Sequence, residues 1–150
     1  MTDVVLVPLT RPEWATLQSG GVLGPLGAHV PTADLGRTFD LDDPDELERA
    51  ALLVASVAAL QRSGERFVVA AAATFDLEPG GRLGQATIAR LTLGDVTAYF
   101  VDAPAAAGAV RAAAVACRDL DLDEAWDEPD VQALLEHDLL WHGPSEPLPL

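Results

Sequence analysis

The segment from Phe67 to Phe75 constrains the fold more than any other part of the chain, because Thr74 is its only polar residue. A continuous apolar run of this kind, bounded by polar and turn-forming residues, is typical of a strand that is covered on both faces. The segment therefore predicts a central strand of a sheet. Alanine fills residues 70–73 and leaves little side-chain bulk, so helices are expected to pack closely against this strand.

Two capping patterns predict helices before this strand. Thr10 and Glu13 have the spacing of a capping box, so a helix is expected to follow and to end near residues 20–21. Asp43 stands at an N-cap position before Pro44, with Glu46 in place for the return arm of the box. The second pattern predicts the longest helix, over residues 44–62.

The expected helix 44–62 is apolar on every side over much of its length. Between Ala50 and Leu60 only Ser56 is polar, which indicates burial on more than one side. We therefore expect Leu53 or Leu60 to be covered by something other than the sheet. The C-terminal segment around Trp141 is the expected cover, and a twofold dimer through this helix is the alternative.

Shorter apolar runs predict four further strands, at residues 4–7, 28–30, 86–91 and 97–101. The pattern indicates one α/β (α+β-like) domain over residues 1–150, with Ala-rich helices on a mixed sheet of about four or five strands. Parallel pairing is expected in its first half and antiparallel pairing in its second.

The connecting segments have weaker patterns. Residues 33–39 are expected to be irregular or to form one helical turn, and Asp102 is expected to cap the helix that follows it. A short helix is predicted to begin at residues 127–130 and to end near Leu135. The proline-containing tail at 143–150 is expected to be extended.

The charge of the chain excludes some classes of partner. All nine basic residues are arginine, and 24 acids give a formal net charge of −15. This charge opposes binding to nucleic acid or to an anionic membrane surface, and it favours simple solubility, with a basic protein partner or adaptation to high salt as alternatives. Cys117 lies in an Ala/Val helical run and is expected to be a buried, inert thiol. The chain shows no leader-like pattern and no membrane-spanning run, so a cytoplasmic location is expected.

No cofactor is expected from the motifs. The glycine-rich residues 20–27 lack the Gly-Lys-Ser/Thr ending of a phosphate-binding loop. Asp119, Asp121 and Asp123 resemble the start of a calcium loop, but the sixth and twelfth positions of such a loop hold Glu124 and Asp130 instead of Gly and Glu. These aspartates are therefore only weak metal candidates, and an alternation of outward acids with inward leucines also explains them.

The histidines are weak candidates for catalysis. His137, Asp138 and His142 lie close together in the sequence, and His29 could join them only through the fold. Metalloproteases place two histidines four residues apart, with Glu next to the first, and no serine lies in a Gly-x-Ser-x-Gly motif. These observations favour a non-catalytic binding or regulatory module. A small metal-dependent or acid/base enzyme that uses the 137–142 region is the alternative.

The residues from Leu139 to His142 are the most hydrophobic part of the polar C-terminal region. They are expected to pack onto the sheet or onto the long helix, while an exposed aromatic patch for a partner is the alternative. A protein partner or a second copy of the chain would then bind through helix 44–62 or the Trp141 region.

Five ordered segments together resemble a known family. They are Val4–Thr10, Asp45–Ala51, Arg66–Ala71, Val96–Asp102 and His137–Trp141. This series is similar to a family of small proteins of unknown function from high-GC Gram-positive bacteria. The resemblance implies a small cytoplasmic domain, and it implies no activity, cofactor or catalytic residue. The family often has an aromatic residue where this chain has His142.

Overall fold

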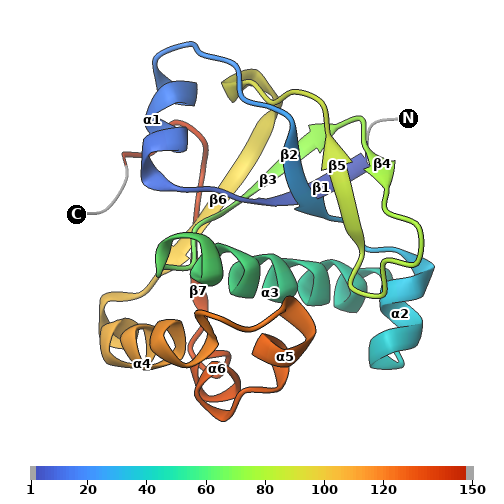
Figure 1. Ribbon diagram of the computed structural model, residues 1–150. Coiled ribbons are helices and arrows are strands. Elements are labelled where there is room, and N and C mark those ends of the chain that lie inside the picture. The colour runs from blue at the N-terminus through green and yellow to red at the C-terminus, as the bar shows by residue number, and fades with distance from the viewer. Residues whose placement is uncertain (1–2, 148–150) are drawn as a thin grey trace.

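The computed structural model describes residues 3–147, which form a seven-stranded antiparallel sheet with helices on both faces (Figure 1). The sheet order is β4-β5-β2-β1-β3-β6-β7. The strands are β1 (Asp3–Pro8), β2 (Leu26–His29), β3 (Val68–Ala73), β4 (Asp76–Leu77), β5 (Gln85–Ile88), β6 (Val96–Asp102) and β7 (Leu139–His142). The predicted α+β class is confirmed. The strand count was too low, because the short β4 and the C-terminal β7 were not predicted as strands.

The prediction of parallel pairing in a mixed sheet is wrong, because every strand pair is antiparallel. β2 carries the chain back toward the end of the sheet at which β1 begins, and the long helix α3 (Pro44–Ser63) then crosses the sheet once more. The start of β3 therefore lies beside the end of β1, with Val68 opposite Pro8. β3 is an interior strand between β1 and β6, while β1 occupies the middle of the sheet.

One face of the sheet is covered by α1 (Arg11–Gln18). Thr10 and Glu13 form the predicted capping box at its start. Val5 and Val7 of β1 point toward this face and share a core with Trp14 and Leu17 of α1. This follows from the alternation of side chains along a strand.

The opposite face is covered by α2 (Ala33–Phe39) and α3. The carboxylate of Asp43 accepts hydrogen bonds from the backbone N–H groups of Asp45 and Glu46, which confirms the predicted N-cap of α3, whereas the side chain of Glu46 does not form the predicted return bond of a capping box. Small residues of α3 share a core with Leu6 and Ala70 of the sheet. Residues 33–39 form a complete short helix, because the side chain of Thr32 caps it and tertiary contacts bury Leu35.

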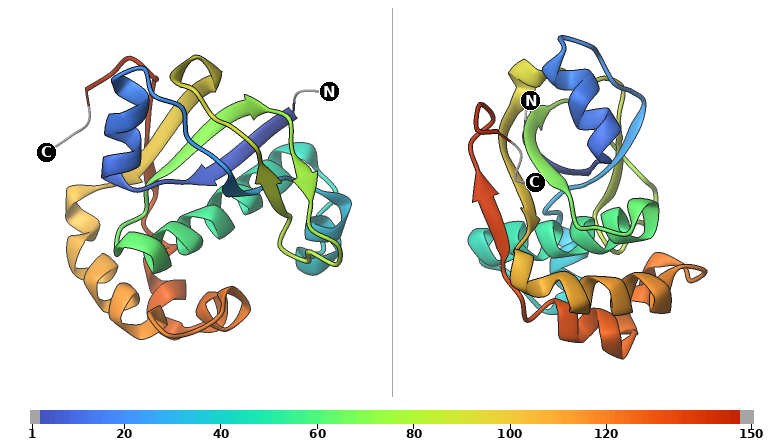
Figure 2. Two further views of the ribbon diagram at one scale, coloured as in Figure 1. Left: turned by 45° about the horizontal axis from the view of Figure 1, so that its top comes forward. Right: turned by 90° about the vertical axis from the view of Figure 1, so that its left-hand side faces the viewer.

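A third layer covers the side of α3 that faces away from the sheet. It consists of α4 (Ala107–Cys117), α5 (Leu122–Asp127) and α6 (Pro129–Leu134), seen below α3 in Figure 1. Leu60 is buried in a core with Val110 and Cys117 of α4, so its predicted burial away from the sheet is confirmed. The predicted cover by the Trp141 segment is wrong, because that segment pairs with β6 as the edge strand β7 (Figure 2).

The described part of the tail, residues 143–147, forms a turn beside the sheet. The hydroxyl of Tyr99 lies 2.9 Å from the carbonyl oxygen of Glu146 and 3.0 Å from that of Pro147, and donates to them. The predicted extended tail also includes residues 148–150, which lie outside the described residues.

Candidate functional site: a groove between α3 and β7

A buried arginine positions β7 at the edge of the sheet. Arg66 is fully buried, and its Nε donates to Asp102 Oδ1 at 2.6 Å while its backbone N–H donates to Oδ2 at 2.9 Å. Its Nη2 donates to the carbonyl oxygen of His137 at 3.1 Å. One cation therefore ties the chain before β3 to the end of β6 and to the turn that leads into β7.

The predicted capping role of Asp102 is wrong. α4 has no side-chain cap, and both carboxylate oxygens of Asp102 bind Arg66 instead. A buried guanidinium needs a nearby carboxylate more than an exposed helix start needs a cap, because an unpaired buried charge costs several kcal/mol whereas a missing cap costs about 1 kcal/mol.

Two adjoining hollows form a groove between the first half of α3 and strands β6 and β7. Their volumes are about 270 and about 280 Å³, and both are lined by Arg49, Leu52 and Phe100. We call them together the α3–β7 groove. Apolar side chains line most of its length, namely Leu6, Leu52, Leu53, Ala70, Phe100, Leu135 and Leu139.

An exposed tryptophan continues this apolar surface. Trp141 lies directly opposite Phe100 in the pairing of β6 with β7, so the two side chains share a face of the sheet. Trp141 is 61% exposed, while Phe100 is half-buried. A large aromatic side chain left in water beside an apolar groove is typical of an interaction site.

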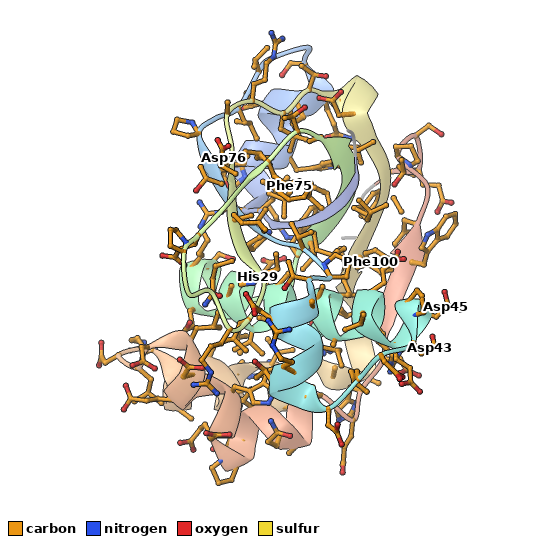
Figure 3. The ribbon with its side chains drawn as sticks, turned by 90° about the vertical axis from the view of Figure 1, so that its right-hand side faces the viewer. His29, Asp43, Asp45, Phe75, Asp76 and Phe100 are labelled. Carbon is orange, nitrogen blue, oxygen red and sulfur yellow. The ribbon has the colours of Figure 1, made fainter. Side chains whose placement is uncertain are left out.

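The rim of the groove is acidic. Asp45 and Glu48 of α3 line one hollow and Asp138 lines the other. Arg49 lies between them, with its Nη2 3.6 Å from Asp138 Oδ1. Figure 3 shows Asp45 and Phe100 on the side of the molecule where α3 begins and β7 forms the edge.

The structure does not bring the predicted histidines together. His137 and Asp138 are exposed at the groove, at the turn before β7. His142 lies at the far end of β7 on the opposite face, where its ring stacks on Tyr99 at 5.0 Å and its Nδ1 lies 2.9 Å from Glu146 Oε2. His142 stands five positions after His137, which corresponds to about 16 Å of extended chain.

His142 and Glu146 hold the turn that follows β7. The backbone N–H of Gly143 and the side chain of His142 both bind Glu146, and together they lower the pKa of this carboxyl below its usual value. The Nε2 atom of His142 is buried without a hydrogen-bond partner among the described residues. This pair lies on the sheet face opposite the groove and stabilises the chain end against Tyr99.

His29 lies elsewhere, on β2, and three strands separate β2 from β7. It is 5% exposed, and its Nδ1 lies 2.9 Å from the carbonyl oxygen of Leu83. Burial lowers the pKa of His29, although the Leu83 bond and the charge of Glu78 oppose this shift. His29 is therefore neutral at pH 7 and remote from the other two histidines.

The predicted aspartate series lies around the start of α5. Asp121 caps this helix and forms a capping box with Glu124, while Asp119 and Asp123 are exposed. Within residues 3–147, no three His, Cys, Asp or Glu side chains are arranged so that they could hold a metal ion. Asp121 therefore has a structural role that accounts for its position.

Sequence reasoning did not identify Phe100, Leu52 or Arg66 as components of a site. Phe100 and Leu52 are apolar residues of predicted elements, and their exposure depends on how far α3 covers the sheet. The sequence does contain an indication that Arg66 is buried, because a charged residue directly before an apolar strand is a candidate for burial with a partner of opposite charge. Its partner Asp102 is 36 residues away, and the sequence does not show that pairing.

The chain is a small α+β protein whose α3–β7 groove has an acidic rim and a mostly apolar lining. Among the described residues, no helix is long and apolar enough to cross a membrane. The chain belongs to a family of unknown function, DUF6912, whose model matches residues 4–150. This confirms the resemblance to a family of unknown function, while the bacterial source that it implies stays a prediction. No curated protein and no solved structure matches the chain.

Proposed function

We propose that this protein is a non-catalytic cytoplasmic binding module that recruits a basic segment of a partner protein to the α3–β7 groove. The exposed Trp141 beside an apolar groove is the observation that carries the proposal. Aromatic side chains of this kind are enriched among the residues that dominate protein interfaces. An apolar side chain of the partner would fill the groove next to Phe100.

The charge of the rim favours a cationic partner. Asp45, Glu48 and Asp138 outnumber Arg49 around the groove, and the whole chain carries a formal charge of −15. Lysine or arginine residues on either side of the apolar anchor would meet these carboxylates, and this attraction would accelerate association. A second copy of the chain would place the same acidic rims against each other, so charge disfavours a twofold dimer through this surface.

A binding role is also favoured over acid/base catalysis by the placement of the candidate groups. His137 and Asp138 are exposed, and His142 lies on the other face of the sheet. A general base must reach its substrate proton within hydrogen-bonding distance inside a shared pocket. His137 and Asp138 line one hollow of the groove but are exposed to solvent there, and His142 does not reach them, whereas the exposed Trp141 lies next to Phe100 of the groove.

Selection of peptides from a random displayed library against the purified protein tests this proposal. The enriched peptides are expected to carry an apolar residue flanked by Lys or Arg, and their affinity is expected to fall as salt increases. Trp141→Ala should weaken binding by about tenfold or more, the range of an interface anchor. Val115→Ala, which removes exposed apolar surface on α4 far from the groove, serves as the matched control.

Two outcomes would contradict the proposal. Enriched peptides without basic residues would exclude charge recognition, and binding unaffected by Trp141→Ala would exclude the groove. Light scattering on the same samples tests whether a second copy of the chain occupies the groove instead of a peptide. A dimer that Trp141→Ala dissociates would assign this surface to the second copy.

A further inference from the structure

A larger hollow lies away from the α3–β7 groove, on the face of the sheet that α3 covers. Its volume is about 570 Å³, and it extends from the second half of α3 over strands β2, β5 and β4. Its lining includes Gly27, His29, Arg62, Asp76, Glu78 and Thr87. The proposed partner-binding function makes no use of it.

The missing side chain of Gly27 keeps this hollow open. Gly27 pairs with Thr87 across β2 and β5, and Thr87 pairs with Asp76 across β5 and β4, so the three positions form one row on one face of the sheet. A Cβ atom added to Gly27 would meet nothing within 4 Å. The space above the row is therefore free of protein atoms at the position where a side chain would otherwise stand.

His29 presents a hydrogen-bond acceptor to this space. A carbonyl oxygen can only accept a hydrogen bond, so the contact of 2.9 Å with Leu83 requires the proton on Nδ1. In the neutral ring Nε2 then carries the free electron pair, and it makes no hydrogen bond within residues 3–147. The two ring nitrogens point in widely different directions, so Nε2 faces away from Leu83 while the side chain lines the hollow.

The charged groups around His29 are an ion pair, Arg62 with Glu13, and two acids whose carboxylates make no hydrogen bond or ion pair within residues 3–147. Arg62 donates to the carbonyl oxygen of Pro8 at 2.8 Å and to both carboxylate oxygens of Glu13, so its cation is already neutralised. Asp76 and Glu78 are exposed and line the same hollow. Figure 3 shows His29 close to α3 and Asp76 farther along the sheet.

We propose that this hollow binds a small organic cation, whose ammonium or guanidinium N–H groups donate to His29 Nε2 and to the carboxylates of Asp76 and Glu78. These three groups all accept hydrogen bonds, so they select a ligand rich in donors. They do not form a metal site, because no three such side chains within residues 3–147 are arranged to hold one ion. An elongated polyamine or a basic amino acid derivative has donors spaced widely enough to reach all three.

Nuclear magnetic resonance titration of the whole protein with spermidine, a linear triamine, tests the proposal. The Cε1 proton of His29 is expected to shift and to saturate, and bound cation is expected to lower the midpoint of the His29 titration further. A neutral diol of similar length should produce no shift. A net charge of −15 attracts any polyamine weakly, so the readout has to be specific to His29.

Three variants separate the pocket from this general attraction. Gly27→Val places a branched side chain, suited to a strand, in the part of the hollow between His29 and Asp76 and should weaken or abolish the saturable shift. Asp76→Asn should weaken binding by about two- to fivefold, as expected for one exposed charge pair. Asp123→Asn removes the same charge at α5 and should leave binding at His29 unchanged.

The proposal is overturned if the shifts do not saturate and spread over the acidic surface. It is equally overturned if Gly27→Val binds as the wild type does, or if Asp76→Asn and Asp123→Asn have the same effect. Asp76 is exposed, so its substitution tests the site even if Gly27→Val reduces stability.

Discussion

Arg66 shows how a single buried charge can determine the position of an edge strand. Its guanidinium is fully buried and meets Asp102, whose side chain is 16% exposed, as well as the carbonyl oxygen of His137. The paired ions do not by themselves guarantee a gain in stability, because both lose hydration. Removal of one partner lowers the free energy of unfolding strongly, because the other charge is then buried without a counter-charge.

Asp102→Asn is therefore expected to lower the free energy of unfolding by about 3 kcal/mol or more. Urea denaturation monitored by tryptophan fluorescence measures this change. Asp119→Asn, an exposed acid-to-amide change, should cost less than about 0.5 kcal/mol. The double variant Arg66→Met/Asp102→Leu should cost less than the sum of its single variants, and strict additivity would contradict the coupling.

The buried His29 should make the free energy of unfolding depend on pH. Burial lowers the pKa of His29 in the folded protein, so the unfolded chain binds the proton more tightly. Its contribution to stability is complete above the unfolded value of about 6.5, and it is lost as the pH falls through the lower folded value. The slope of the free energy of unfolding against pH between pH 7 and pH 5, measured by urea denaturation, should therefore flatten in His29→Gln, and an unchanged slope would contradict this assignment.

At the scale of elements, local signals predicted the starts of α1 and α3 correctly, whereas the helix cap at Asp102 and the strand directions were predicted wrongly. Thr10 and Asp43 cap the helices that they were predicted to cap, because a cap depends on residues two or three positions away. Strand direction and the partner of β7 depend on contacts between distant residues, which no local pattern carries. The groove was missed for the same reason, although Trp141 was recognised as a candidate interaction residue.

The start of α3 permits a direct test of the capping interpretation. Asp43→Ala removes the acceptor of the Asp45 and Glu46 backbone N–H groups, so it should cost about 1 kcal/mol. At this chain length the melting temperature should fall by about 2–4 °C. Asp42→Ala, one position outside the cap, is the control for loss of charge. A rise in stability together with loss of peptide binding would show that Asp43 belongs to a functional site instead.

At the scale of the whole molecule, the arrangement of the layers explains why the surface has two separate candidate sites. The sheet lies between α1 and α3, and α4–α6 cover the outer side of α3 (Figure 2). The long helix is thus buried along its middle, while its two ends leave parts of the sheet uncovered. The α3–β7 groove lies toward one end, and the hollow at Gly27 and His29 lies toward the other.

The middle position of β1 also affects how the protein emerges from the ribosome. β1 precedes its neighbours β2 and β3 in the chain, and these are complete only after residues 29 and 73. Until β3 is complete, the backbone edge of β1 that pairs with β3 is open to other chains. Nascent chains that pause before residue 73 would expose this unpaired edge to intermolecular pairing, so the interval before β3 is the period in which a chaperone would protect the chain most.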